Sequence, residues 1–170
     1  MATTWKLDPA HSELTFKVKH MMISNLKGNF QTFDAEIQAE DESFKNAKTT
    51  ATIQTDSIFT NNTDRDKHLK SADFFNTEAN PTITFESDAL NDEITGNLTM
   101  NGVTKPVKLV VDFGGINIDP WGNTKAGFSV EGKINRKDFG LNWNSALETG
   151  GVLVSDEVKI SGEFQFVKQA

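Results

Sequence analysis

The sequence predicts an all-β domain: an antiparallel barrel of about eight strands with one short surface helix. Three observations support this fold class. Apolar and polar residues alternate with a period of two along most of the chain, turn signals recur between the alternating tracks, and only one segment has the pattern of a helix. Strands at regular spacing with so little helix are typical of a closed barrel or a sandwich.

The strands are predicted from the alternation itself. Each track turns apolar side chains to one face and polar side chains to the other, as in an antiparallel strand with one dry and one wet face. The clearest tracks cover residues 14–18, 94–100, 107–113, 128–134 and 158–166. Val110 is the one apolar residue on the outer face of its track.

Turn signals separate the tracks. The strongest is Asn101-Gly102, a dipeptide that favours a two-residue hairpin. Further turns are predicted at Gly114-Gly115, Asp119-Pro120 and Gly150-Gly151. Ala35 and Ile37 fall out of phase with the apolar residues before them, which predicts a β-bulge near residues 31–33.

One segment is predicted to be helical. Asn62-Thr63 can cap the run 64–71, which has acidic residues in its first turn. Because the run is short and highly charged, we expect it to lie on the surface over one opening of the barrel.

Composition limits the classes of function. A chain of 170 residues is expected to form one domain, residues 1–170, with a core that needs no covalent support. The absence of cysteine excludes disulfides and thiolate metal sites. A formal net charge of -7 argues against nucleic acid, and against anionic membranes as standing partners, because both require clustered Lys and Arg.

The N-terminus contains no apolar stretch of signal-peptide length, and the longest aliphatic run, residues 109–111, is too short to span a bilayer. We therefore expect a cytoplasmic protein in the form given, or a periplasmic one if a signal peptide has been removed.

Four apolar tracks contain a glycine on their inward side: Gly28, Gly96, Gly132 and Gly162. A glycine there either leaves internal space or lets the strand coil tightly at a barrel corner. Four such positions in one small domain favour internal space, and an eight-stranded barrel is wide enough to hold one small ligand.

The inward residues of the tracks predict an apolar ligand-binding cavity with almost no titratable group. Its ligand would be apolar and extended. The predicted lining residues are Leu14, Phe16, Val18, Phe30, Phe85, Leu98, Met100, Leu109, Val111, Phe128, Val130, Gly132, Ile134, Ile160, Gly162 and Phe164.

A polar rim is predicted from His11, Arg136 and Trp143. Arg136 lies in a turn-like stretch, where a cation could meet a pyrophosphate or a quinone oxygen, although an ordinary salt bridge is the alternative. The three histidines lack metal-ligand spacing, and no serine has the context of a nucleophile. The sequence therefore predicts no metal, no cofactor and no catalytic residue.

Five segments, taken together, resemble the YceI-like family of polyisoprenoid-binding proteins nearly end to end. They are residues 5–16, 26–33, 65–87, 96–107 and 134–143. The resemblance implies a lipocalin-like antiparallel barrel that encloses the tail of a polyisoprenoid or a similar long lipid, without catalysis and without a metal.

The leading hypothesis is a non-catalytic carrier of a long-chain isoprenoid lipid, of the isoprenoid quinone or polyprenyl phosphate type. Transient contact with a membrane and a homodimer are further expectations. Two alternatives remain: an enzyme that acts on a lipid in the same cavity, and a structural β-domain with a filled core.

Overall fold

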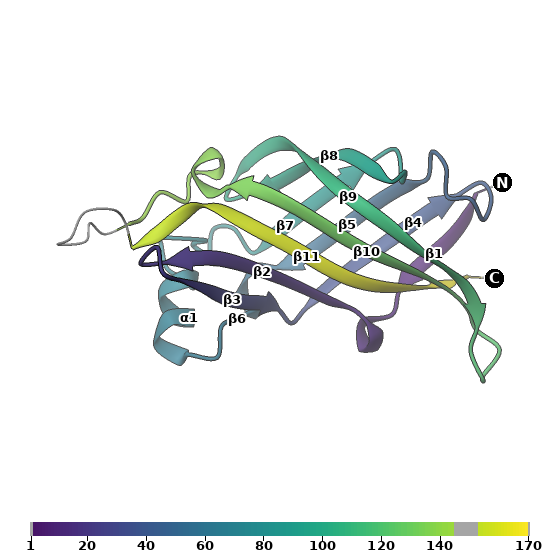
Figure 1. The fold of residues 1–170 in the computed structure, drawn as a ribbon, viewed down its shortest axis with the longest axis horizontal. Helices are drawn as coiled ribbons and strands as arrows, with labels where there is room; N and C mark the ends of the chain where they lie inside the picture. Colours follow the sequence, from purple (N-terminus) through teal and green to yellow (C-terminus); the bar gives the residue numbers. More distant parts are fainter. Residues whose placement is uncertain (1, 145–152, 170) are drawn as a thin grey trace.

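The computed structural model describes residues 2–144 and 153–169, and its strands form one antiparallel sheet that closes into a barrel (Figure 1). Eight strands make the closed ring, because the last strand pairs with the first. In ring order they are β1 (Thr3–Leu7), β4 (Phe33–Ala39), β5 (Lys48–Gln54), β7 (Thr82–Ser87), β8 (Glu93–Met100), β9 (Val103–Ile118), β10 (Thr124–Asn135) and β11 (Val154–Lys168). The predicted barrel of about eight strands is confirmed.

Three further strands extend the wall at one end: β2 (Glu13–His20), β3 (Ser24–Phe30) and β6 (Ile58–Phe59). They attach because β11 changes partner along its length, pairing with β2 over its first part and with β1 over residues 166–168. β5 continues through a short 3-10 turn, η2 (Thr55–Ser57), into β6, which pairs with β3. The same barrel is therefore closed by different strands at its two ends.

The predicted bulge near residues 31–33 is wrong. β3 ends at Phe30 and β4 starts at Phe33, and the two strands pair with different neighbours. The chain turns a corner between them, where the Gln31 N–H donates to the Ser57 carbonyl at 3.1 Å. A change of phase in the apolar pattern marks either event, so the pattern alone did not distinguish a corner from a bulge.

The other turn predictions have mixed outcomes. Asn101 and Gly102 form the two-residue β8–β9 turn, both with positive φ, and the Asp119-Pro120 turn joins β9 to β10. The turn predicted at Gly114-Gly115 is wrong, because both residues lie inside β9. The register shifts there opposite Gly127, which makes the site a bulge, with Gly115 at φ 106°. Gly150-Gly151 lies outside the described residues.

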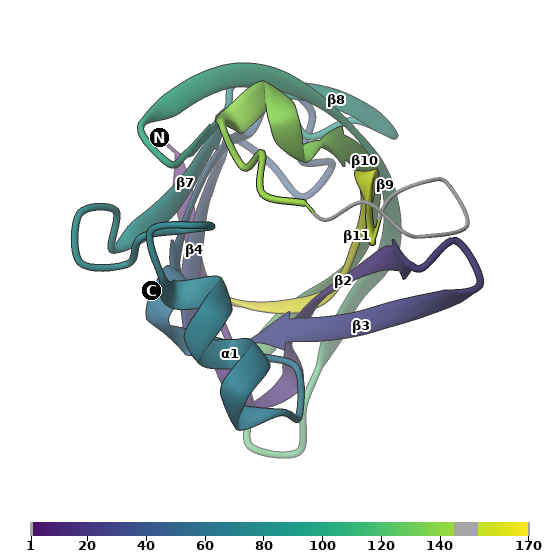
Figure 2. The same cartoon turned by 90° about the vertical axis from the view of Figure 1, so that its left-hand side faces the viewer.

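The predicted helix is confirmed as α1 (Thr63–Lys70). The Asn62 side chain caps it by accepting a hydrogen bond from the Arg65 N–H at 3.0 Å. None of its residues is fully buried, and it lies beside one end of the barrel (Figure 2). The other short helices are 3-10 turns, η1 (Pro9–His11) and η3 (Arg136–Phe139).

Aromatic side chains fill the opposite end, where both termini lie (Figure 1). Trp5 and Phe44 are each only 1% exposed, and their ring centroids are 5.0 Å apart. Phe44 also packs edge-on against Phe128 at 5.2 Å. This cluster closes the barrel at the end away from α1.

A partly buried ion pair fastens the segment between β1 and β2 to β10. Asp8 accepts a hydrogen bond from Lys125 Nζ at 2.7 Å, and its carboxylate also lies 2.8 Å from His11 Nδ1. The Lys125 ammonium holds the pKa of the Asp8 carboxyl below its ordinary value, with His11 acting in the same direction against the opposing effect of burial.

The inward glycines do not leave empty space, contrary to expectation. A side chain at Gly28, Gly96 or Gly162 would collide with the ring of Phe16, Phe85 or Phe164 respectively. A side chain at Gly132 would collide with Leu109 in the same way. Neighbouring side chains lie across these glycines, so the glycines are required for close packing of the wall.

We expect Asp8→Asn to lower the free energy of unfolding by about 1 kcal/mol at neutral pH, because it removes the charge that pairs with Lys125. The folded pKa of Asp8 is depressed, so this stabilisation is complete above the unfolded pKa of about 3.9. It is lost as the pH falls through the folded pKa. Urea unfolding at a series of pH values measures the difference, with the exposed Asp112→Asn as the control. A difference that persists in strong acid would contradict a charge effect.

Gly96→Ala is expected to destabilise the protein by about 1–3 kcal/mol, because the added carbon meets both the Phe85 ring and the main-chain oxygen of Glu86, the latter at 2.7 Å. Gly127→Ala is the matched control, since no atom lies within 4 Å of the added carbon there. Thermal unfolding of the two variants tests the difference. Equal melting temperatures would show that the wall relaxes freely around Gly96.

Candidate lipid-binding cavity

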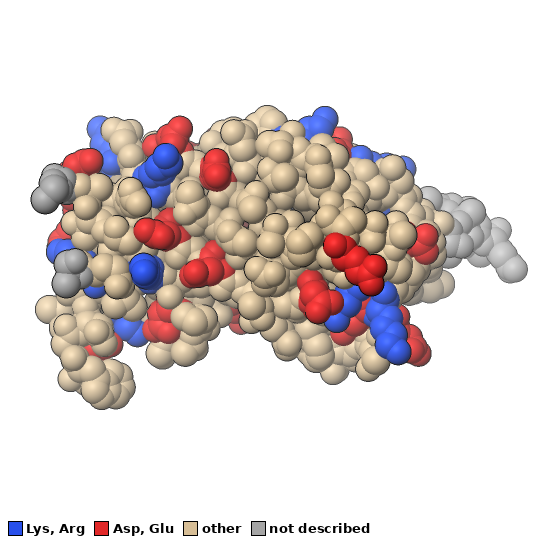
Figure 3. Space-filling model, turned by 180° about the vertical axis from the view of Figure 1, so that it is seen from behind, with Lys and Arg blue, Asp and Glu red and all other residues tan. Residues whose placement is uncertain are grey.

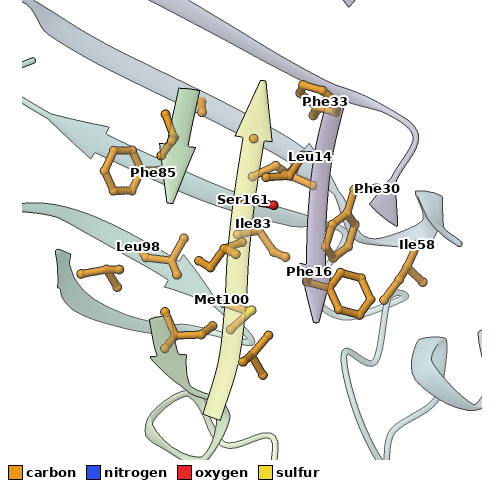
Figure 4. A pocket seen from close by; sticks show the side chains of 18 of the residues that line it. Leu14, Phe16, Phe30, Phe33, Ile58, Ile83, Phe85, Leu98, Met100 and Ser161 are labelled. Carbon is orange, nitrogen blue, oxygen red and sulfur yellow. The ribbon is translucent and has the colours of Figure 1, made fainter. Parts of the chain in front are cut away.

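The barrel encloses an elongated cavity of about 380 Å³. This volume falls in the range of known small-molecule sites. Figure 4 shows phenylalanine, leucine and isoleucine side chains from both walls converging on it. At the α1 end His20, Arg65 and His68 line the cavity and are only half-buried, whereas Trp5 and Phe44 block the other end. The mouth of the cavity therefore lies at the α1 end.

Fifteen of the sixteen predicted lining residues do line the cavity. Many of them, such as Leu14, Phe16 and Val130, are only partly buried although they face the inside of the barrel. Their remaining exposure is to the cavity. Gly132 is the exception, because Leu109 lies over it.

Sequence reasoning found only Phe85 in the wall formed by β4, β5 and β7 and missed the rest. Phe33 and Ala35 of β4, Ala51 and Ile53 of β5 and Ile83 of β7 all line the cavity. Their alternation was present in the sequence, but the tracks are short and contain alanine, so they stand out less. The two alanines leave the cavity wide at this wall.

Cationic and imidazole side chains gather at the mouth. Arg65 and His68 come from α1, His20 from the end of β2, and Arg136 from η3. No carboxylate from the described residues lines the cavity. His20 could have been found from the sequence, because it continues the inward track of β2 two residues beyond Val18.

Arg65 keeps part of its guanidinium available. Its Nε donates to Thr60 Oγ1 at 2.8 Å, and Nη2 donates to the Thr60 carbonyl. Asp66 accepts from the same Thr60 hydroxyl, which fixes the arrangement. Nη1 of Arg65 makes no hydrogen bond to any residue described, so it can serve a ligand.

His68 belongs to an aromatic cluster at the same mouth. Its ring lies edge-on to Trp143, with centroids 4.7 Å apart, and edge-on to Phe74 at 5.1 Å. Its Nε2 lies 2.9 Å from Asp73 Oδ2, which orients the imidazole. Trp143, predicted at the rim, therefore does lie at the mouth and lines the cavity.

Arg136 lines the cavity at its mouth, as predicted, but it is not free to meet a ligand there. Its side chain is 4% exposed, and its guanidinium donates to the carbonyls of Leu141, Trp143, Val154 and Ser155. These bonds hold the segment after η3 against the start of β11. Burial lowers the pKa of Arg136, while Asp156 acts in the opposite direction. Arg136 shapes the mouth, because four of its donors are already used by the main chain.

The predicted rim position of His11 is wrong. It is exposed on η1, bound to Asp8, and does not line the cavity. It lies on η1 between β1 and β2, outside the elements that line the mouth. A proline-induced turn at Pro9 takes it out of the β2 track, and alternation does not anticipate such a turn.

Residues 2–144 and 153–169 contain no group of three or more His, Asp or Glu side chains arranged to hold a metal ion. No helix in this part of the chain has the length and apolar character needed to cross a membrane.

The chain is similar to known proteins over almost its whole length. It is 42% identical over 166 residues to a UPF0312 protein of Staphylococcus epidermidis, covering 96% of this chain and 97% of that protein. The structure of the Campylobacter jejuni YCEI protein is 33% identical and superposes with a TM-score of 0.76, covering 89% of this chain and 90% of that one.

A polyisoprenoid binding domain from Saccharophagus degradans shares the fold, with a TM-score of 0.67 over 97% of this chain and 98% of that one, at 14% identity. The model of the YceI-like domain family matches residues 5–166. The family match and the Staphylococcus relative both span the strands that build the cavity. The chain therefore belongs to the YceI-like family.

Proposed function

We propose that this protein carries one long-chain isoprenoid lipid with its tail inside the barrel. The observation that carries the proposal is a cavity whose described lining is apolar apart from Thr49 and Ser161 in the strands and the cationic and imidazole side chains at the mouth. The polyisoprenoid binding domain of Saccharophagus degradans, which has the same fold, supports this choice of lipid class.

The polarity of the cavity favours one orientation of the cargo. The tail lies toward the aromatic cluster at the closed end, and the headgroup lies at α1, near Arg65 and His68. Arg65 keeps Nη1 as a donor, and no described carboxylate lines the site to repel an anion. A polyprenyl phosphate or the carbonyl oxygen of an isoprenoid quinone meets this requirement.

The energetics favour exchange over permanent storage. Burial of roughly 0.8 kcal/mol per CH₂ would hold a tail of several isoprene units very tightly against water. A bilayer offers the tail an equally apolar environment, so the net free energy of moving the tail between protein and membrane is small. The protein is then a carrier that equilibrates with membranes.

We further propose that carriage involves no reaction. Ser161 lines the cavity, but its hydroxyl bonds Thr15 Oγ1 at 2.7 Å on the outer face instead of a general base. The imidazole of His68 is held by Asp73 beside aromatic rings, with no described nucleophile bonded to it.

Native mass spectrometry of gently purified protein, with solvent extraction, tests the proposal directly. A discrete bound mass of isoprenoid type is expected. Protein that is free of lipid and stays so after incubation with quinone-loaded and polyprenyl-phosphate-loaded vesicles would overturn it, and would favour a structural β-domain.

Ala51→Phe is expected to abolish most lipid loading in a folded protein, because the new ring enters the cavity from β5. Thr52→Phe is the matched control, since Thr52 is the next residue on the same strand and faces solvent. Bound lipid per protein is measured by mass spectrometry, and circular dichroism checks the fold. Unchanged loading in Ala51→Phe would mean that the lipid binds elsewhere.

Arg65→Gln is expected to weaken binding of a polyprenyl phosphate about tenfold or more, through loss of a charge-assisted hydrogen bond. Binding of the uncharged polyprenol of equal length should change little, because its tail contacts are intact. Lys67→Gln is the control, being exposed on the same helix and absent from the lining. An equal loss for both lipids would place the headgroup away from Arg65.

A further inference from the structure

Three consecutive apolar residues stand in solvent at the tip of the β2–β3 hairpin. Met21, Met22 and Ile23 are 42%, 54% and 82% exposed. The hairpin tip lies at the α1 end of the barrel, beside the mouth of the cavity (Figures 1 and 2). His20, which precedes the tip, lines the cavity, and so does Leu153, whose carbonyl accepts from the Met21 N–H at 2.7 Å. The apolar tip is therefore continuous with the cavity wall.

The backbone of this tip does not suit its side chains. Met21 and Met22 have φ of 55° and 62°, the left-handed region that favours Asn and Gly. At the two-residue β8–β9 turn, where φ is also positive, the chain uses Asn101-Gly102. Stability alone would favour residues of this kind at positions 21 and 22, so two exposed methionines indicate a requirement outside the fold.

The hairpin is also a local exception to the acidic character of the chain. Residues 14–33 contain no Asp or Glu, although the chain has 24 of them. The same stretch carries three exposed lysines, Lys17, Lys19 and Lys27. The chain is acidic overall, but this hairpin is basic and has an apolar tip.

Strand pairing places lysines of other strands beside this segment, so that together they form a basic row across the sheet. Lys27 of β3 pairs directly with Lys17 of β2, Lys17 with Lys159 of β11, and Lys159 with Lys133 of β10. Lys133 lies 3.9 Å from Glu157, whereas Lys17, Lys27 and Lys159 form no ion pair with any described residue. Like charges directly opposite one another destabilise a sheet, so the row is unfavourable unless an anion faces it.

We propose that the tip (Met21, Met22 and Ile23) and the lysine row (Lys17, Lys27, Lys159 and Lys133) form a docking surface for an anionic lipid bilayer. The tip enters the boundary between headgroups and acyl chains, and the lysines face the lipid phosphates. Docking in this way brings the cavity mouth to the membrane. The purpose of this docking rests on the proposed carriage of lipid, but docking itself does not depend on it.

Among the described residues, no other exposed apolar tip is joined to a row of mostly unpaired lysines. On the face seen in Figure 3, acidic and basic side chains are interspersed. A second apolar tip, with Ile118 64% and Trp121 82% exposed, lies on the β9–β10 hairpin at the closed end. A second copy of this chain could bury the Met tip, but it would leave the lysine row without a partner. A bilayer accounts for both.

Flotation of lipid-free protein with vesicles tests the docking surface without any isoprenoid. The vesicles contain phosphatidylcholine alone or mixed with phosphatidylglycerol. Wild-type protein is expected to float with the anionic vesicles. Met21→Asn combined with Met22→Gly should lower binding at least tenfold, while the melting temperature stays equal or rises because both residues suit a positive φ. A purely structural role for the tip predicts a lower melting temperature.

The lysine row has its own test. Lys17→Gln with Lys27→Gln should lower binding to anionic vesicles about fivefold per lysine and leave weak binding to neutral vesicles unchanged. Lys48→Gln with Lys105→Gln is the charge-matched control, because both lysines are exposed away from the row. Trp121→Asn is the control for an exposed apolar tip at the closed end.

Several results would overturn the proposal. They are flotation of the tip variant like the wild type, loss of flotation in Trp121→Asn alone, or a tip variant that changes only a monomer–dimer equilibrium in light scattering. Failure of docking is distinguishable from failure of the proposed cargo. If the protein floats with vesicles but never loads isoprenoid, the docking surface stands and the proposed cargo is wrong. If it loads isoprenoid but does not float, the cargo stands and the docking surface is wrong.

Discussion

The change of partner along β11 is the constraint on which the rest of the structure depends. Its last residues pair with β1 and close the eight-stranded ring, so no edge remains at that end. Its first residues pair with β2 instead, which brings β3 and β6 into the wall. One end is thereby narrow enough for Trp5 and Phe44 to fill, and the other is wide enough for a mouth.

This asymmetry organises the chemistry of the cavity. Alternation sends apolar side chains inward along every strand, and the closed end leaves no route for polar groups. Among the described residues, cationic and imidazole side chains therefore line the cavity only where α1, η3 and the end of β2 surround the mouth. Arg136 donates its hydrogen bonds to main-chain carbonyls and keeps the mouth in shape, while Arg65 retains a donor that a ligand can reach.

At two places the residue types differ from those that the local backbone conformation favours, and the reasons differ. Inward glycines in the wall are required because neighbouring phenylalanine rings and one leucine lie across them. The positive φ of Met21 and Met22 has no such packing reason, since both side chains are in solvent. Departures from the locally favoured residue that packing does not explain are expected at functional surfaces.

The sequence by itself determined the fold class, the helix, the β8–β9 turn and nearly all of the predicted lining, because alternation and capping are local and have a fixed period. Only the tertiary structure decided what depends on which strands become neighbours: the corner at residues 31–33, the bulge at Gly114-Gly115, the burial of Arg136 and the removal of His11 from the mouth. The same holds for the lysine row. Its members lie up to 142 positions apart between Lys17 and Lys159, and register alone places them opposite one another, since hydrogen bonds between strands connect residues that no local pattern relates.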